Sequence, residues 1–513
     1  MKTVTKFPLQ DLVKLPIFVL PGAAWNGQEI AYYSDQSGQM ELWVVDIETG
    51  RHRQVSRGQL PKSLHAGFVW DRAGRTIVFA KDQNGDEQHD LWGLDLESRE
   101  ARPLTNEPNA QEIPIEFSPD DRHISFASTR NGQLNLFSVN ADGSDVRQFS
   151  DFSNPLLLGG RWSPDGRQLT ACVNETDNLR NIDVYLVAAD GSGAQRIFRS
   201  SEGARDLAMA WSPDGKSLAI TSDASGVNHP GILDLETGQV RWLGVEEVDE
   251  TARTFSPDGK LLLALRNQDA RLMPVIYETD RGAERVPAFA EGGSVIGPTD
   301  ADFVLGGEAI VVGYSTDATR AELLLYDLEA SETRVLVKAA YGAIDPSAFV
   351  MAEDVYYTSF DDVRIHGLLY RPHDIHPEER VPAIVMPHGG PTAQYFHGFD
   401  SYVQFLVNEG YVVLAPNIRG STGYGVEFRD SALMDWGGAD LKDIVAGREY
   451  LANLPFVDPD RIGIFGGSYG GYMTCMATTK APEFWKAGIA WVGMTDLHAL
   501  YDESMPHFKY YLR

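Results

Sequence analysis

The stretch Arg461-Ile-Gly-Ile-Phe-Gly-Gly-Ser-Tyr-Gly-Gly-Tyr472 decides how the rest of the chain is interpreted. An apolar, strand-like run enters a glycine cluster with Ser468 at its centre, and a helix-like run follows to residue 480. Gly466-x-Ser468-x-Gly470 is the pattern of a nucleophile elbow, a strained strand-to-helix turn that exposes a serine hydroxyl. Small residues flank such a serine because strand and helix approach closely. We expect the Tyr469 N–H and the helix start beside it to stabilise an oxyanion.

Length and composition limit the classes of protein that fit. The 513 residues are enough for two or three domains, and a hydrophobic content of 43% is ordinary for globular cores. The formal net charge of −29 argues against nucleic acid and anionic membrane surfaces as partners. The two cysteines imply no disulfide framework, and the N-terminus lacks the apolar core of a signal peptide. We therefore expect a cytoplasmic protein.

The first two-thirds of the chain repeats with a period of about 46 residues. An aromatic residue opens each unit, a turn such as Ser-Pro-Asp-Gly follows, and two β-rich runs come next. The openers are Trp25, Trp70, Phe117, Trp162, Trp211, Phe255 and Phe303. Units of this length hold four short strands, as in a β-propeller blade. The sequence therefore predicts seven blades over residues 17–345, after an N-terminal segment of residues 1–16, with the opening aromatics packed between blades.

From residue 346 onward, apolar strands alternate with helix-like runs. We expect strands near 355–360, 364–371, 382–388, 412–416, 461–465 and 487–492, with helices near 400–408, 439–454 and 472–480. This alternation predicts a mostly parallel sheet covered on both faces, with functional groups at the carboxyl ends of its strands. Arg419, after one such strand, either binds a substrate carboxylate or forms an internal ion pair, and we favour the ion pair.

His388-Gly389-Gly390-Pro391 follows another of these strands. In α/β-hydrolases the loop at this position supplies a second backbone N–H to the oxyanion hole, often from an H-G-G motif. Its glycines, Gly389 among them, let the backbone approach the reacting carbonyl. His388 is interpreted as a residue that orients this loop, or as a structural histidine, rather than as the catalytic base.

A propeller followed by this domain resembles the prolyl oligopeptidase family, especially its acylaminoacyl-peptidase and dipeptidyl-peptidase branches. The resemblance covers nearly all of the chain and rests on four motifs in family-like order: SFDDVRIHGLLYRP (359–372), HGGP (388–391), NIRGSTGYG (417–425) and GGSYGG (466–471). It implies a serine peptidase for short peptides, with the propeller controlling access. By this match Ser468 is the nucleophile, and the N–H groups of Tyr469 and Gly390 form the oxyanion hole.

The chain departs from the family downstream of the serine. The order Ser…Asp…His is the rule for this fold, but only 45 residues follow Ser468. Asp496, His498, Asp502 and His507 lie there, and none follows a further apolar strand that could place it beside the serine. We therefore expect an α/β-hydrolase domain over 346–513 that is truncated after its sixth strand, with an exposed apolar edge and little or no activity.

The fold class expected is thus an all-β seven-bladed propeller plus a C-terminally incomplete α/β-hydrolase domain. The favoured function is hydrolysis of short peptides through an acyl-enzyme on Ser468. The alternatives are a non-catalytic propeller that binds peptides or a partner, and an esterase for small acyl esters. The sequence predicts no cofactor and no metal. It leaves open the residue preference, exo- or endopeptidase action, the oligomeric state, and whether the chain is a fragment or a natural truncation.

Overall fold

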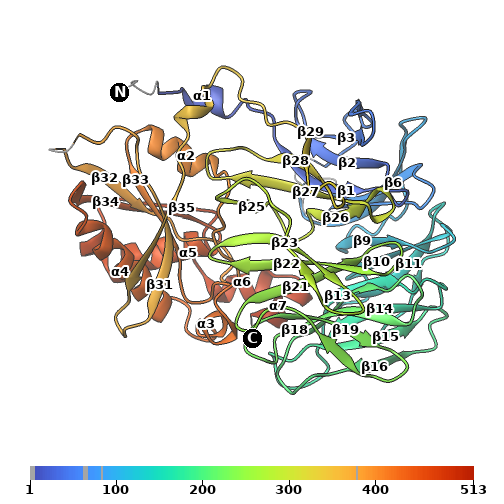
Figure 1. The fold of residues 1–513 in the computed structure, drawn as a ribbon. Helices are drawn as coiled ribbons and strands as arrows, with labels where there is room; N and C mark the ends of the chain where they lie inside the picture. The colour runs from blue at the N-terminus through green and yellow to red at the C-terminus, as the bar shows by residue number, and fades with distance from the viewer. Residues whose placement is uncertain (1–5, 62–66, 83–84, 377–378, 513) are drawn as a thin grey trace.

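The computed structural model describes residues 6–61, 67–82, 85–376 and 379–512, in two parts joined near residue 345 (Figure 1). The larger part is a ring of seven antiparallel sheets, and the smaller part is a mixed sheet with helices. This arrangement confirms the predicted fold class of a seven-bladed propeller followed by an α/β-hydrolase type of domain. We call the two parts the propeller and the α/β domain.

Each of the first six blades is a sheet of four strands in sequence order. Their bounds are β1–β4 (Phe18–Ala23, Glu29–Ser34, Glu41–Asp46, His52–Gln54), β5–β8 (Phe68–Trp70, Thr76–Asp82, His89–Asp95, Ala101–Pro103), β9–β12 (Glu112–Phe117, His123–Ser128, Asn135–Asn140, Arg147–Gln148), β13–β16 (Leu156–Trp162, Gln168–Val173, Asp183–Ala188, Ala194–Phe198), β17–β20 (Asp206–Trp211, Ser217–Ser222, His229–Asp234, Val240–Trp242) and β21–β24 (Asp249–Phe255, Leu261–Gln268, Arg271–Glu278, Glu284–Arg285).

The seventh blade has a divided inner strand, because β25 and β26 both pair with β27. Its strands are β25 (Gly293–Val295), β26 (Ala301–Val304), β27 (Ala309–Thr316), β28 (Glu322–Asp327) and β29 (Thr333–Val337), with the short 3-10 helix η1 (Leu305–Gly307) after β26. Blades 1 and 7 close the ring through a shared cluster that includes Ile30 and Leu323. Closure by side-chain packing follows, since every strand of both blades comes from consecutive sequence.

The repeated turns and aromatic residues explain why the blades form where they do. Gly166 and Gly215 in the Ser-Pro-Asp-Gly turns have φ of 71°, which favours glycine. Ser163 Oγ donates to Asp165 Oδ1 at 2.7 Å and fixes the turn before it. Five of the seven opening aromatics are buried. Trp25 departs from the expectation: it lies at the surface, 48% exposed, with the Arg72 guanidinium 3.7 Å from its ring centre.

The α/β domain is one six-stranded sheet in the order β30-β31-β33-β32-β34-β35. Its strands are β30 (Glu353–Thr358), β31 (Arg364–Tyr370), β32 (Val381–Val385), β33 (Val412–Asn417), β34 (Val457–Gly467) and β35 (Gly488–Trp491). β31 pairs antiparallel with both β30 and β33. The strands β33, β32, β34 and β35 run parallel to one another. All six strands agree with the predicted positions to within a few residues.

Helices and short turns complete the chain. They are α1 (Leu9–Leu12), η2 (Pro346–Ala348), α2 (Ser401–Asn408), α3 (Val426–Asp430), α4 (Ala439–Ala452), α5 (Tyr469–Lys480), η3 (Pro482–Phe484), α6 (Leu497–Glu503) and α7 (Pro506–Tyr511). The α/β core packs α4 and α5 against the sheet through residues such as Ile444 and Met473. No helix within the described ranges has the length and apolar character needed to cross a membrane.

Candidate active site

Ser468 lies at a sharp turn between β34 and α5. Its φ of 55° and ψ of −120° are values that a residue with a side chain rarely adopts. The Ser468 N–H donates to the Trp491 carbonyl on β35 at 3.0 Å, which ties the turn to the neighbouring strand. The side chain is exposed at the carboxyl end of the parallel strands. The strained turn that the motif predicts is therefore present.

Two glycines make this turn sterically possible. A Cβ atom on Gly466 would lie 2.4 Å from the Gly470 carbonyl oxygen. A Cβ atom on Gly470 would lie 2.2 Å from the carbonyl oxygen of Pro387. Both obstacles are backbone atoms, so side-chain rotation cannot relieve them. Strand, helix and the loop after β32 can meet only because these positions lack side chains.

The loop His388–Pro391 lies directly beside the serine. A Cβ atom on Gly389 would lie 3.6 Å from Ser468 Cβ and 4.0 Å from Ser468 Oγ. Gly390 follows with φ of 124°, in the region that favours glycine. Because β32 and β34 are parallel neighbours, the loops at their carboxyl ends meet at one edge of the sheet. The structure thus brings Ser468, Gly389 and Gly390 together.

His388 is buried and supports the loop rather than contacting the serine. Its Nδ1 pairs with the Gly389 carbonyl oxygen at 2.6 Å, and its Nε2 pairs with Ser421 Oγ at 2.8 Å. Burial lowers the pKa of His388, which keeps the ring neutral near pH 7. Since both ring nitrogens have partners, this geometry fits the orienting role better than that of a base.

Tyr469 contributes its backbone and its side chain in different ways. Its N–H belongs to the first turn of α5, where N–H groups have no partner within the helix and point toward an incoming anion. Its buried hydroxyl donates to the carboxylate of Asp440 in α4, and its ring meets Trp436 edge-on at 5.1 Å. Burial raises the pKa of Tyr469 and of Asp440. Sequence reasoning missed Asp440, because an acidic residue in the first turn of a helix is common.

The hydrogen bonds of the four acidic and histidine residues downstream of the serine go to groups other than the serine side chain. Asp496 caps α6 by accepting from the N–H groups of His498 and Ala499, each at 3.0 Å. The carbonyl oxygen of Asp502 accepts from Lys509 Nζ at 2.8 Å. His507 is buried, and burial lowers its pKa. Within the described part of the chain, no hydrogen bond joins any of these residues to the Ser468 side chain.

The edge of the sheet that carries Ser468 faces the propeller. Gln394, in the loop after β32, pairs with Asn267 at the end of β22, and the Gln394 Nε2 donates at 3.1 Å. The Val426 N–H, after β33, donates to the Gly226 carbonyl oxygen at 2.7 Å. Because β32, β33 and β34 run parallel, their carboxyl ends lie at this one edge of the sheet, with Ser468 directly after β34.

Arg419 forms the internal ion pair that the sequence analysis favours. Its Nη1 lies 2.7 Å from Asp361 Oδ2, and its Nη2 lies 3.1 Å from Asp443 Oδ1. Asp443 is fully buried, so the guanidinium is committed to these carboxylates.

The described part of the chain offers no evident place for a metal ion. No group of three or more His, Cys, Asp or Glu side chains among the described residues could hold an ion.

Comparison with known sequences identifies both parts of the chain. The sequence model of the TolB β-propeller domain matches residues 14–155 and 156–347. The sequence model of the prolyl oligopeptidase family matches residues 397–511, which include the elbow at Ser468. The α/β domain thus carries the sequence signature of the prolyl oligopeptidase family. The Ser468 elbow and the propeller are the features that the sequence motifs predicted.

Individual relatives match over most of this chain. It is 24% identical to the dipeptidyl aminopeptidase BIII of Pseudoxanthomonas mexicana, over 94% of this chain and 71% of that protein. It is 26% identical to the uncharacterized peptidase YuxL of Bacillus subtilis, over 90% of this chain and 78% of that protein. Among solved structures, a puromycin hydrolase shares the fold with a TM-score of 0.85 at 21% identity, covering 99% of this chain and 83% of that one.

Proposed function

We propose that the protein is a serine peptidase that cleaves short peptides, with Ser468 as the nucleophile. The observation that carries the proposal is a serine held at positive φ beside the Gly389–Gly390 loop and at the start of α5. Attack by Ser468 Oγ on a scissile carbonyl places the new oxyanion between the N–H groups of Tyr469 and Gly390. The peptide amine leaves with a proton, and water then hydrolyses the acyl-enzyme.

The position of the propeller supports short peptides as substrates. The loops that border Ser468 contact propeller residues such as Asn267 and Gly226, so a substrate reaches the serine between the two parts. We propose that this arrangement favours extended peptides over folded proteins as substrates. The net charge of −29 supports the absence of nucleic acid and anionic membranes among the partners.

The proton acceptor for Ser468 is the part of the mechanism that the described residues do not supply. A serine hydroxyl is a weak nucleophile until a general base takes its proton. His388 is the histidine in the loop beside Ser468, and both of its ring nitrogens are engaged elsewhere. We propose that the 513-residue chain is slow for this reason, and retains only about a 10³–10⁴-fold acceleration over water from oxyanion stabilisation and binding.

A fluorophosphonate probe, which forms a covalent adduct with an activated serine, tests the assignment. We expect slow labelling of the 513-residue chain at Ser468, located by peptide mass, and none in Ser468→Ala. Ser431→Ala, which changes an exposed serine at the end of α3, should label like the parent. The product of the full genomic reading frame is labelled in parallel. Absence of an adduct at Ser468 in both proteins would falsify the proposal.

A substrate panel separates the peptidase from the two alternatives. The relatives include a protein named as a dipeptidyl aminopeptidase, so the panel holds dipeptidyl and N-acylated aminoacyl anilides together with simple acyl esters. Turnover of anilides supports a peptidase, and turnover of esters alone supports an esterase. Peptide binding in calorimetry without labelling or turnover supports a non-catalytic propeller. A cytoplasmic location stays a prediction, which cell fractionation checks.

A further inference from the structure

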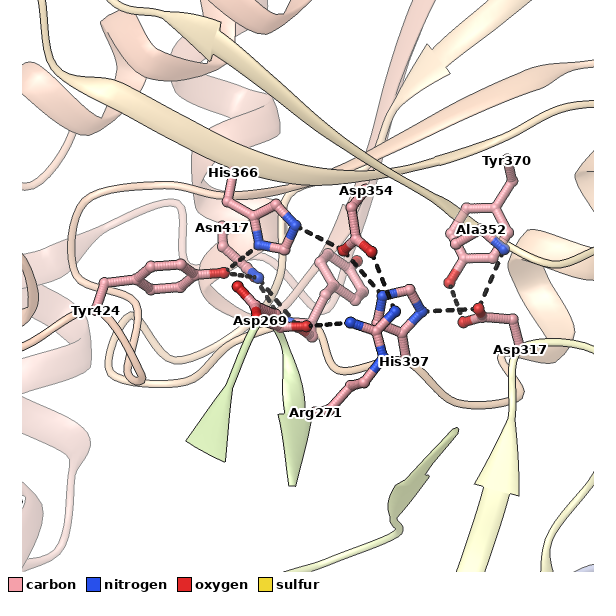
Figure 2. A network of polar contacts seen from close by, with 11 residues as sticks. Asp269, Arg271, Asp317, Ala352, Asp354, His366, Tyr370, His397, Asn417 and Tyr424 are labelled. Atoms are coloured by element: carbon pink, nitrogen blue, oxygen red, sulfur yellow. Dashed lines mark hydrogen bonds and ion pairs between the residues drawn. The ribbon is translucent and has the colours of Figure 1, made fainter. Parts of the chain in front are cut away.

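A polar cluster with a buried centre joins the propeller to the α/β domain (Figure 2). Its centre is His397, in the loop between β32 and α2, whose side chain is 1% exposed. The His397 N–H donates to the Ala270 carbonyl oxygen at 2.8 Å, in the turn between β22 and β23 of the propeller. We define the His397 cluster by its members: Asp269, Arg271, Asp317, Asp354, His366, Tyr370, His397, Asn417 and Tyr424.

The His397 ring lies between two carboxylates, one from each part of the molecule. Its Nδ1 is 2.8 Å from Asp317 Oδ2, which follows β27 in blade 7, and its Nε2 is 3.0 Å from Asp354 Oδ1 in β30 (Figure 2). Ionised carboxylates only accept hydrogen bonds, so both ring nitrogens must carry a proton for both bonds to exist. The geometry therefore requires an imidazolium cation at position 397.

Both carboxylates are already saturated with donors, which excludes a shared carboxyl proton as the explanation. Asp317 accepts from the Tyr370 hydroxyl at 3.0 Å and from the N–H groups of Ala352 and Gly398, each at 3.1 Å. All three donors belong to the α/β domain, whereas Asp317 belongs to the propeller. Asp317 is thus a propeller residue held inside the α/β domain, with His397 as its charged partner.

Asp354 of the α/β domain in turn accepts hydrogen bonds from a donor in the propeller as well as from its own domain. It accepts from Arg271 Nη2 of the propeller at 3.1 Å and from His366 Nε2 at 2.9 Å. Burial raises the pKa of Asp354, but hydrogen bonds from His397 and Arg271 outweigh it and hold the pKa at about 2. His366 accepts from the Tyr424 hydroxyl through Nδ1 at 2.6 Å, and burial lowers its pKa, so it stays neutral. The cation between the carboxylates is therefore His397 and not His366.

We propose that His397 is a pH-operated bridge between the propeller and the α/β domain, and that its deprotonation loosens the interface through which substrates reach Ser468. A neutral ring keeps one N–H, so one carboxylate then faces a lone pair. Asp317, Asp354 and Asp269 would remain together with Arg271 as the cation beside them. Repulsion between the unpaired carboxylates favours separation of the two parts.

The direction in which pH changes the His397 bridge follows from the groups that face the His397 ring. Burial lowers the pKa of His397, but the hydrogen bond and charge of Asp317 outweigh it, and the pKa is raised. The bridge is therefore complete below the ordinary value of about 6.5 and is lost as pH rises through the higher folded value. The other charged or titratable groups that face His397, its carboxylates or Tyr370 are Asp269, Arg271, His366, Tyr370, Tyr395, Asp400 and Tyr424.

The first test observes the proton itself in the unmodified protein. With ¹⁵N-labelled histidine, NMR should show one ring with both nitrogens protonated, and its midpoint should lie above pH 6.5. The resonance is assigned by its loss in His397→Gln. A ring at position 397 that is neutral at pH 6 would overturn the proposal. This measurement does not depend on activity, so it can fail while the proposed function stands, and the reverse also holds.

The second test observes the opening by small-angle X-ray scattering between pH 6 and 10. The parent protein should stay near the ~24 Å radius of gyration of a compact chain of this length at pH 6, and expand as pH rises. His397→Gln, whose amide carries no charge, should be expanded throughout with no pH step. His366→Gln is the matched control: it removes another ring from Asp354, but within the α/β domain, and should keep the step. A parent radius that is constant over this range would overturn the proposal, as would an unchanged pH step in His397→Gln.

Discussion

The Ser468 elbow of the α/β domain and the His397 cluster between the α/β domain and the propeller are two polar centres that are built in opposite ways. The elbow is made of backbone: glycines at 466 and 470 and the Gly389 loop bring chain segments closer than any side chain allows. The His397 cluster is made of polar and charged side chains from distant segments, with Asp317, His366 and His397 buried at its centre and Asp269 and Asp354 more exposed at its rim. The elbow therefore depends on glycines that have no side chain, whereas the cluster depends on the balance between its positive and negative groups. Substitutions should affect them in different ways.

The largest effect is expected where a single methyl group enters the elbow. In Gly470→Ala the new Cβ would lie 2.2 Å from the Pro387 carbonyl oxygen, so α5 and the loop after β32 must separate. We expect a loss of about 3 kcal/mol or more in the free energy of unfolding. Displacement of Ser468 by about 1 Å should slow fluorophosphonate labelling about 10²-fold. Urea unfolding and the labelling rate measure the two effects.

The control for this substitution is Gly67→Ala, where no atom of the described residues lies within 4 Å of the added Cβ and φ is not in the left-handed region. It should leave both the unfolding curve and the labelling rate at parental values. If Gly470→Ala behaved in the same way, the elbow would not be the tightly packed junction described above. The pH dependence of domain opening should be the same in both variants, because neither alters the charge of the His397 cluster.

A charge substitution in the cluster should give a smaller effect that depends on pH. Asp317→Asn keeps the shape of the side chain but turns one acceptor into a donor, which then faces other donors. We expect a loss of about 1–3 kcal/mol at pH 6. Because the His397 bridge is complete below about pH 6.5 and lost above its raised pKa, the difference from the parent protein should shrink as pH rises. Urea unfolding at several pH values measures it.

Asp145→Asn is the surface control, since Asp145 pairs with Arg147 where both side chains are exposed. It should change the free energy of unfolding by less than about 0.5 kcal/mol at every pH. A difference for Asp317→Asn that stays constant from pH 6 to 10 would contradict the assignment of a cation to His397. Labelling of Ser468 near neutral pH should remain close to the parental rate in Asp317→Asn, since the elbow is intact.

The two centres also differ in how much of them the sequence could predict. The elbow, its glycines and the His388 loop were predicted because each is a local pattern with one steric explanation. The blades were predicted for the same reason, since the Ser-Pro-Asp-Gly turns and opening aromatics recur at a regular period. Arg419 could be assigned to an ion pair on its position after a strand, although its partners Asp361 and Asp443 could not.

The His397 cluster could not be predicted, because its members are spread from residue 269 to residue 424 with no local signature. Only the folded chain places Asp317 of blade 7 inside the α/β domain. Trp25 was predicted to be packed between blades like the other openers, yet Arg72 covers it at the surface instead. Helices α3, α6 and α7 were missed because each is at most seven residues long, too short for apolar periodicity to be recognised.

A more modest effect is expected at Asp440, which connects the elbow to a buried charge. The Tyr469 hydroxyl donates to this carboxylate. Asp440→Asn still accepts that hydrogen bond but loses its charge, so we expect a cost of about 1 kcal/mol and labelling about fivefold slower. Tyr469→Phe removes the bond altogether. Because one variant weakens and the other removes the same interaction, the double variant should cost less than the sum of the two, and a purely additive result would contradict the anchoring role.

The smallest effect on stability is expected at Ile489 of β35, whose side chain belongs to neither centre. It is the edge strand of the sheet, and Ile489 and Trp491 on it are 63% and 52% exposed. Ile489→Lys should change the free energy of unfolding by less than about 0.5 kcal/mol, because the side chain loses little burial. It should nevertheless reduce aggregation, since a charge on an edge strand opposes pairing with another chain. Light scattering during storage measures this, with Thr479→Lys on the exposed side of α5 as the control. That variant adds the same charge away from the edge, so equal protection by both substitutions would show that net charge, and not the open edge, governs association.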